Sequence, residues 1–66
     1  MSVYSAVKDI ANKKGKSIRQ IEVDLEFGNG VISKWNKSVP AADRLQAVAD
    51  YLGVTSSYIL NKSKED

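Results

Sequence analysis

The sequence contains no cysteine and no histidine, and only one proline and one tryptophan among 66 residues. The absence of cysteine excludes disulfides, thiol nucleophiles and cysteine-ligated zinc or iron–sulfur centres. The absence of histidine removes the side chain most used for acid–base catalysis and for metal binding. A chain of this length buries only about 60% of its unfolded surface. We therefore expect one small, well-packed domain with no cofactor and no bound metal.

The residues that remain do not predict an enzyme. Ser33 and Lys34 are adjacent, so their side chains diverge on a helix and cannot form a catalytic dyad. The carboxylates are scattered without the spacing of a metal site. No apolar run approaches the roughly 18–20 residues of a membrane span, and the first residues lack the basic and apolar regions of a signal peptide. We expect a cytoplasmic, non-enzymatic protein.

The net charge of +2 is unevenly distributed along the chain. In residues 13–44, seven basic side chains face four acidic ones: Lys13, Lys14, Lys16, Arg19, Lys34, Lys37 and Arg44 against Glu22, Asp24, Glu26 and Asp43. An anionic partner is therefore expected to bind the middle of the chain. For the three lysines at 13–16 a second interpretation stays open, because basic residues also stabilise a helix C-terminus.

Apolar residues recur at helical spacing along nearly the whole chain. The pattern predicts helices over about residues 2–14, 17–25, 28–36, 40–52 and 55–60. Ser17 and Thr55 are suitable first caps, and Gly15 and Gly53 stand where helices are expected to end. The sequence therefore predicts an all-α fold, a compact five-helix bundle with Trp35 in its core.

The second and third expected helices, joined by a glycine-containing turn, form the helix-turn-helix pattern. The ordered set of residues resembles the phage Cro and repressor type of helix-turn-helix domain, the XRE family. It consists of residues 17–35, Pro40, Leu45, Ala49, the run Leu52-Gly53-Val54 and the final Tyr58-Ile59-Leu60-Asn61. The resemblance implies a lambda-repressor-like domain over residues 1–61, followed by a polar tail or the start of a linker at 62–66.

The same resemblance implies a function. It predicts a sequence-specific transcriptional regulator, a phage-type repressor or Cro-like protein, in a bacterial or phage-infected cell. The partner would be a double-stranded DNA operator, bound by a homodimer with the recognition helix, about residues 28–36, in the major groove. A second function stays open, in which the same fold is a protein-interaction module that acts as an antirepressor or co-regulator.

Three residues depart from the family pattern, which often has a small residue at 22, glycine at 26, and serine or threonine at 28. Here these positions are Glu22, Glu26 and Gly28. A left-handed turn costs glutamate roughly 1 kcal/mol more than glycine, so we expect Gly28 to take the bend. Acidic groups repel phosphate, so we expect Glu22 and Asp24 to face sideways and to pair with basic residues, Glu22 with Arg19.

Candidates for reading DNA bases lie on the first turns of the third expected helix. Asn29 offers a bidentate pair for adenine, Lys34 a donor for guanine or phosphate, and Val31 an apolar contact for a thymine methyl group. The full set is Asn29, Gly30, Val31, Ser33 and Lys34. Two alternatives stay open: Asn29 as a helix cap, and Lys34 as a solvated surface lysine.

A second set is expected to contact phosphates, because the N-terminus of the helix at 17 presents free N–H groups and the loop after residue 36 is polar. The set is Ser17, Ile18, Arg19, Gln20, Asn36, Lys37, Ser38 and Arg44. A dimer surface is expected at Tyr51, Tyr58 and Ile59, or equally in a C-terminal region outside this chain. No small-molecule ligand is expected.

Overall fold

The computed structural model describes residues 2–64, which fold into four α-helices and one short 3₁₀-helix. The elements are α1 (Val3–Lys13), α2 (Ile18–Asp24), the 3₁₀-helix η1 (Ser33–Asn36), α3 (Ala42–Leu52) and α4 (Ser56–Ser63). Within this range no residue is in a strand, so the all-α prediction is confirmed. None of the helices described is long and apolar enough to cross a membrane.

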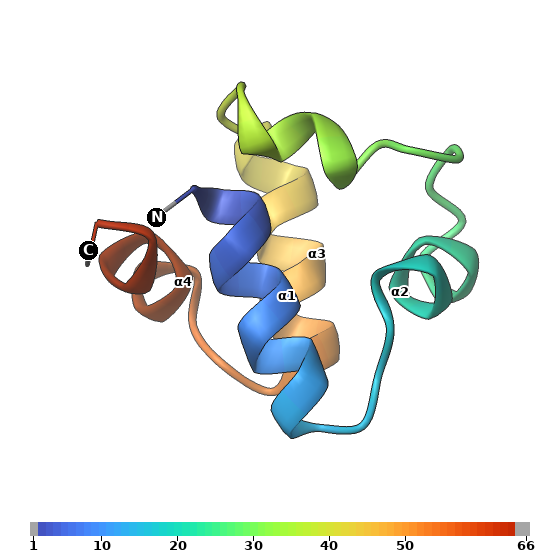
Figure 1. Cartoon of the computed structure of the whole chain (residues 1–66), viewed down its shortest axis with the longest axis horizontal. Helices are drawn as coiled ribbons and strands as arrows, with labels where there is room; N and C mark the ends of the chain where they lie inside the picture. The colour runs from blue at the N-terminus through green and yellow to red at the C-terminus, as the bar shows by residue number, and fades with distance from the viewer. Residues whose placement is uncertain (1, 65–66) are drawn as a thin grey trace.

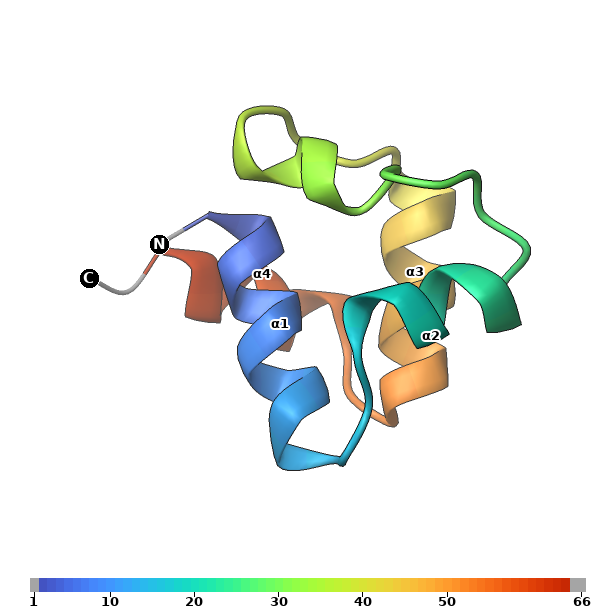
Figure 2. The ribbon, with the colours of Figure 1, turned by 45° about the vertical axis from the view of Figure 1, so that its right-hand side comes forward.

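Helix α1 lies at the centre of the arrangement (Figure 1). It packs against α4, against α2 and against η1, while α3 packs against α4. In Figure 1, α2 and α4 lie on opposite sides of α1, and the segment that contains η1 lies above α1; Figure 2 shows the same order from a second direction. The segment that contains η1 therefore rests on α1.

The helices begin and end where local signals predict. Ser2, Ser17 and Thr55 each accept the backbone N–H three residues further on, at 3.1, 3.0 and 3.0 Å. Gly15 and Gly53 have φ of +73°, the left-handed conformation that closes a helix C-terminus. The bounds predicted for α1, α2 and α3 are thus confirmed to within two residues, whereas α4 ends at Ser63, three residues beyond the expected end at 60.

One buried apolar cluster connects all the elements. Its fully buried members come from the four α-helices and from the residue directly before η1. The largest are Val7, Ile21, Ile32, Val48, Leu52 and Ile59. Trp35 is only 5% exposed, so its predicted place in the core is confirmed. Its ring packs edge-to-face with Phe27, with ring centres 6.4 Å apart.

The third α-helix predicted over residues 28–36 is wrong. Residues 29–32 form turns, and only Ser33–Asn36 is helical, as η1. Two backbone bonds of this segment span three residues: the Val31 N–H donates to the Gly28 carbonyl at 3.2 Å, and the Trp35 N–H to the Ile32 carbonyl at 2.9 Å. A single α-type bond within the segment runs from the Lys34 N–H to the Gly30 carbonyl, at 3.3 Å. The N–H of Ile32, which an α-helix would direct to Gly28, donates to the Glu22 carboxylate instead. The bundle therefore has four α-helices rather than five.

The bend after α2 also differs from the expectation that Gly28 would take it. Glu26 itself has φ of +60° and is the one non-glycine residue of the described chain in the left-handed region. The Phe27 N–H donates back to the Glu22 carbonyl at 2.8 Å, which closes the end of α2 around this residue. Glu26 thus holds a strained conformation that glycine would adopt freely.

We expect Glu26→Gly to stabilise the protein by about 0.5–1 kcal/mol, because the relief of backbone strain exceeds the added flexibility of the unfolded chain. Gly30→Ala is the matched control: Gly30 has φ of +84°, and an added Cβ meets nothing within 4 Å, so the control loses stability through backbone strain alone. Urea unfolding of the two variants measures both. Equal or lower stability of Glu26→Gly would contradict this account of the turn.

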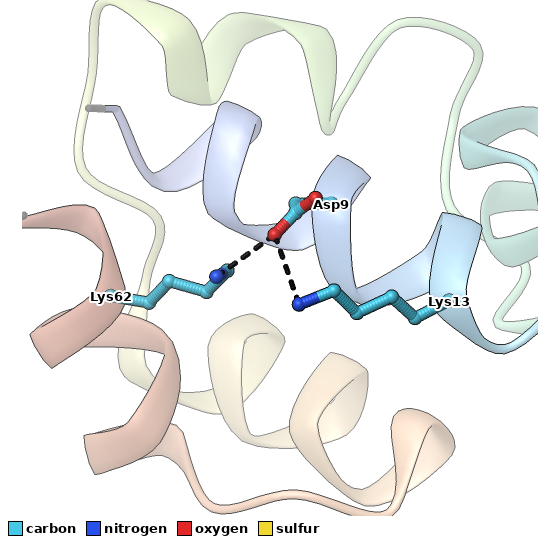
Figure 3. Close-up of polar contacts among 3 residues, drawn as sticks. All are labelled: Asp9, Lys13 and Lys62. Atoms are coloured by element: carbon cyan, nitrogen blue, oxygen red, sulfur yellow. Dashed lines mark ion pairs between the residues drawn. The ribbon is translucent and has the colours of Figure 1, made fainter.

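Helix α4 runs through Ser63, two residues beyond the domain end expected at residue 61. Asp9 of α1 forms an ion pair with Lys62 of α4, and its carboxylate lies 2.8 Å from Lys62 Nζ (Figure 3). The same carboxylate lies 3.6 Å from the Nζ of Lys13 on its own helix. The hydrogen bond with Lys62 is the main reason that the pKa of Asp9 lies below its ordinary value of 3.8. Residues 62–64 of the expected polar tail therefore belong to the fold, and residues 65–66 lie outside the described range.

Candidate nucleic-acid interface

Arg19 on α2 and Asn29 in the following turn are brought together by the fold. The Arg19 guanidinium Nη1 donates to Asn29 Oδ1 at 2.8 Å, and both side chains are exposed. Asn29 makes no capping bond to η1, whose first residue has no side-chain cap. The bond to Arg19 orients the amide and leaves its NH₂ group free to donate to a ligand.

Five other expected contact residues line one hollow of about 290 Å³ beside η1. They are Ser33, Lys34, Asn36, Lys37 and Ser38. All five residues are exposed, and the two lysines carry the positive charge beside the hollow. The hollow joins two residues expected to read bases with three expected to contact phosphate. Most of its wall is apolar, and the hydroxyl, amide and ammonium groups of these residues are potential hydrogen-bond donors at its edge.

Several of the expected phosphate contacts are already engaged within the protein. Ser17 Oγ accepts the N–H of Gln20, the Gln20 side chain donates to Asp24 at 2.7 Å, and Asn36 Oδ1 accepts from Ser2 Oγ at 2.9 Å. Ile18 is half-buried against the core. These groups shape the surface, while Arg19, Lys34 and Lys37 remain exposed to carry its charge.

Arg44, at the start of α3, stacks above the ring of Phe27, with its guanidinium carbon 5.7 Å from the ring centre. Phe27 in turn meets Trp35 edge-on. The three side chains join α3, the turn after α2 and η1. Arg44 therefore lies beside Phe27, which follows α2 by three residues, and it is exposed.

The remaining expected contacts are divided between surface and core. Gly30 and Val31 are half-buried, and Val31 packs against the core, which leaves only part of its side chain for a thymine methyl group. Of the lysines at 13–16, Lys13 pairs with Asp9 and Lys16 lies 5.8 Å from the centre of the Tyr51 ring. These contacts show that the two lysines also serve the fold.

The acidic residues of α2 do not pair as expected. Glu22 is 3% exposed and points inward, where one carboxylate oxygen accepts the Ile32 N–H at 3.1 Å. The expected pair of Glu22 with Arg19 is wrong, because the buried Glu22 accepts from Ile32 and the exposed Arg19 donates to Asn29. Burial withdraws the Glu22 charge from the surface that an anion would approach.

Asp24 stays exposed, and it accepts a hydrogen bond from the Tyr51 hydroxyl of α3 and another from Gln20. The bond from Tyr51 is the main reason that the pKa of Asp24 lies below its ordinary value of 3.8. The same bond raises the pKa of Tyr51 above its ordinary value of 10.0, because it stabilises the protonated phenol. The pair ties α2 to α3.

The Asp24–Tyr51 bond predicts two limits to its stabilising effect. Asp24 has a lowered pKa, so its contribution is present above pH 3.8 and is lost as the pH falls through the folded value. Tyr51 has a raised pKa, so its contribution is present below pH 10.0 and is lost as the pH rises through the folded value. Tyr51→Phe should therefore melt below the wild type by a constant margin between about pH 5 and 9, and the margin should shrink at both ends. A margin independent of pH would contradict the bond.

The three residues expected at a dimer surface do not form one exposed patch. Ile59 is fully buried, so it belongs to the core of the single chain, and this part of the expectation is wrong. Tyr51 is half-buried and bonded to Asp24, whereas Tyr58 is 48% exposed. The helical period explains the division, since adjacent residues on α4 face in different directions.

No family model, curated protein or solved structure matches this chain. Function must therefore be argued from the residues themselves. Within residues 2–64 no three acidic side chains come together in a way that could hold a metal ion.

Sequence reasoning missed two residues that build this surface. The Glu22 carboxylate accepts the N–H of Ile32, ten residues later, and the Phe27 ring contacts both the Arg44 guanidinium and the Trp35 ring. For Glu22 a signal was present: it follows Ile21 and lies between Ile18 and Leu25 on α2, close to the apolar face. A charged residue at such a position requires a buried partner.

Proposed function

We propose that this protein binds double-stranded DNA in a sequence-specific manner and regulates transcription, as a repressor or Cro-like regulator of the XRE type. The observation that carries the proposal is the Arg19–Asn29 pair at 2.8 Å, an exposed cation and amide from two segments. Arginine contacts phosphate and guanine, and an oriented amide donates to a base edge. The hollow beside η1 adds Lys34 and Lys37.

The distribution of charge supports the same function. Of the two carboxylates of α2, Glu22 is buried and Asp24 is exposed but bonded to Tyr51, while Arg19 stays exposed. The carboxylate of Glu26 stays exposed in the turn after α2, and the exposed cations Arg19, Lys34 and Lys37 outnumber it, which favours the approach of a polyanion. The proposed division of roles gives phosphate contact to Arg19, Lys37 and Arg44, and base contact to Asn29 and Lys34.

The mechanism requires no chemistry. Bound to an operator in the cytoplasm of a bacterial or phage-infected cell, the protein would occupy or position a promoter region. A single module of this size offers an interface of about 600–1,000 Å² to DNA. Two copies on neighbouring half-sites would supply the affinity that one copy lacks, so we propose that the protein acts as a homodimer on DNA.

A salt titration of binding to a duplex tests the proposal. We expect log K to fall steeply and linearly with log salt concentration, by about 0.9 per phosphate neutralised. Lys37→Ala should weaken binding to all duplexes alike and make the slope shallower by about 1. Lys8→Ala is the control: Lys8 is an exposed lysine on α1, outside residues 13–44, and its loss should leave the slope unchanged.

Two outcomes would overturn the proposal. One is the absence of binding to any duplex at low salt, which would favour the protein-interaction module instead. The other is an equal effect of Lys37→Ala and Lys8→Ala, which would show that only net charge matters. Fluorescence anisotropy of a labelled duplex measures both.

A further inference from the structure

Glu22 is the one charged residue that is buried in the described part of the chain. It lies on α2, and its carboxylate accepts the backbone N–H of Ile32, ten residues later, at 3.1 Å. A buried carboxylate is costly unless its oxygens are bonded. The bond to the Ile32 N–H offsets part of this cost.

The residue that Glu22 holds stands immediately before η1. The first N–H groups of any helix lack partners within that helix, and a serine, threonine or asparagine side chain commonly supplies one. Here Gly28 has no side chain, Asn29 bonds to Arg19, and η1 has no side-chain cap of its own. The Glu22 carboxylate supplies the missing acceptor from another helix.

Ile32 is also the point where the segment is anchored in the core. Its side chain is fully buried, and its carbonyl accepts the Trp35 N–H at 2.9 Å. Ser33 and Lys34 follow directly and are exposed at the hollow. A shift of the Ile32 backbone would therefore move Lys34 with it.

We infer that Glu22 is a positioning residue, whose side-chain oxygen fixes the start of η1 and thereby sets how Lys34 is presented. What matters is an acceptor at the correct reach, and the negative charge is dispensable. Its consequence for DNA rests on the proposed function, whereas the positioning of Ile32 does not.

Three variants separate reach from charge. Glu22→Gln keeps the length and one acceptor oxygen and removes the charge. Glu22→Asp keeps the charge and is one methylene shorter, so its carboxylate falls short of Ile32. Glu22→Met keeps the approximate length and has no oxygen acceptor. Asp50→Asn is the control for charge, because Asp50 is an exposed carboxylate on α3.

Amide hydrogen exchange of Ile32, measured without DNA, tests the positioning directly. Relative to neighbouring core amides, exchange at Ile32 should be at least about tenfold faster in Glu22→Asp and Glu22→Met, and within about threefold of wild type in Glu22→Gln. Equal protection in all variants would overturn the inference, as would equal loss in Glu22→Gln and Glu22→Met. If Glu22→Met does not fold, the comparison of Glu22→Gln with Glu22→Asp decides the same question.

Binding to duplex DNA provides the second readout. Glu22→Asp should bind about tenfold more weakly, while Glu22→Gln and Asp50→Asn should bind as the wild type or slightly better, because each removes a negative charge. A wild type that binds no duplex refutes the proposed function and leaves the exchange result as the test of positioning. Loss of Ile32 protection in Glu22→Asp with unchanged binding would refute the link to Lys34.

Discussion

Trp35→Ala is expected to unfold the protein or leave it with little residual stability. Trp35 is 5% exposed and packs against Phe27, so truncation removes a large buried ring and leaves a cavity. Such changes cost about 3–5 kcal/mol. A domain of 66 residues has only about 3–10 kcal/mol in total, so the loss is comparable with the whole free energy of unfolding.

Urea unfolding followed by circular dichroism at 222 nm measures the effect. Trp35→Phe is the matched control, since it keeps an aromatic ring against Phe27 and should retain a cooperative transition at reduced stability. A Trp35→Ala variant whose urea midpoint lies close to that of the wild type would show that Trp35 does not support the packing of η1 on α1. Tyr58→Ala, at a residue that is 48% exposed, should change stability far less.

The second large effect is expected at Arg19. Arg19→Ala removes an exposed cation and also frees the Asn29 amide that it orients. If Arg19 contacts the DNA backbone and Asn29 a base, both contacts are lost. We expect binding to the preferred duplex to weaken by about 1–3 kcal/mol, or roughly five- to 150-fold.

A double-mutant cycle with Asn29→Ala tests whether the two residues act as a pair. The coupling should amount to about 0.5–3 kcal/mol, because either substitution alone breaks the same hydrogen bond. Arg19→Lys should keep most of the salt dependence and lose discrimination between sequences, since lysine lacks the planar fork that holds the amide. Additive losses in the cycle would show that Arg19 and Asn29 bind independently or not at all.

The sequence predicts those parts of the fold that depend on neighbours within a turn. Ser17 caps the N–H of Gln20, Thr55 caps that of Tyr58, and Gly53 is left-handed, as the residue types indicate. Each of these signals acts over three or four residues. The apolar spacing of α1 and α3 likewise determines their buried faces.

The segment between α2 and α3 could not be predicted in the same way. Its conformation depends on the Glu22 bond to Ile32 and on the Arg19 bond to Asn29, each across ten residues. Local propensity favours glycine for the bend, yet Glu26 takes it with φ of +60°. The sequence nominates the polar and basic side chains of the candidate site, whereas the structure shows which of them are bonded within the protein and adds Glu22 and Phe27.

The central claim is that this chain recognises a DNA sequence through two parts of the fold, the turn that follows α2 and the helix η1. Selection of bound fragments from a random duplex library is its most direct test. The account predicts enrichment of one short motif, and for a dimer two copies of it in inverted orientation with centres about 10–10.5 base pairs apart. Enrichment should be lost with Asn29→Ala and kept with Lys8→Ala. The claim would be contradicted if the wild type enriched no motif, or if Asn29→Ala and Lys8→Ala enriched the same motif equally.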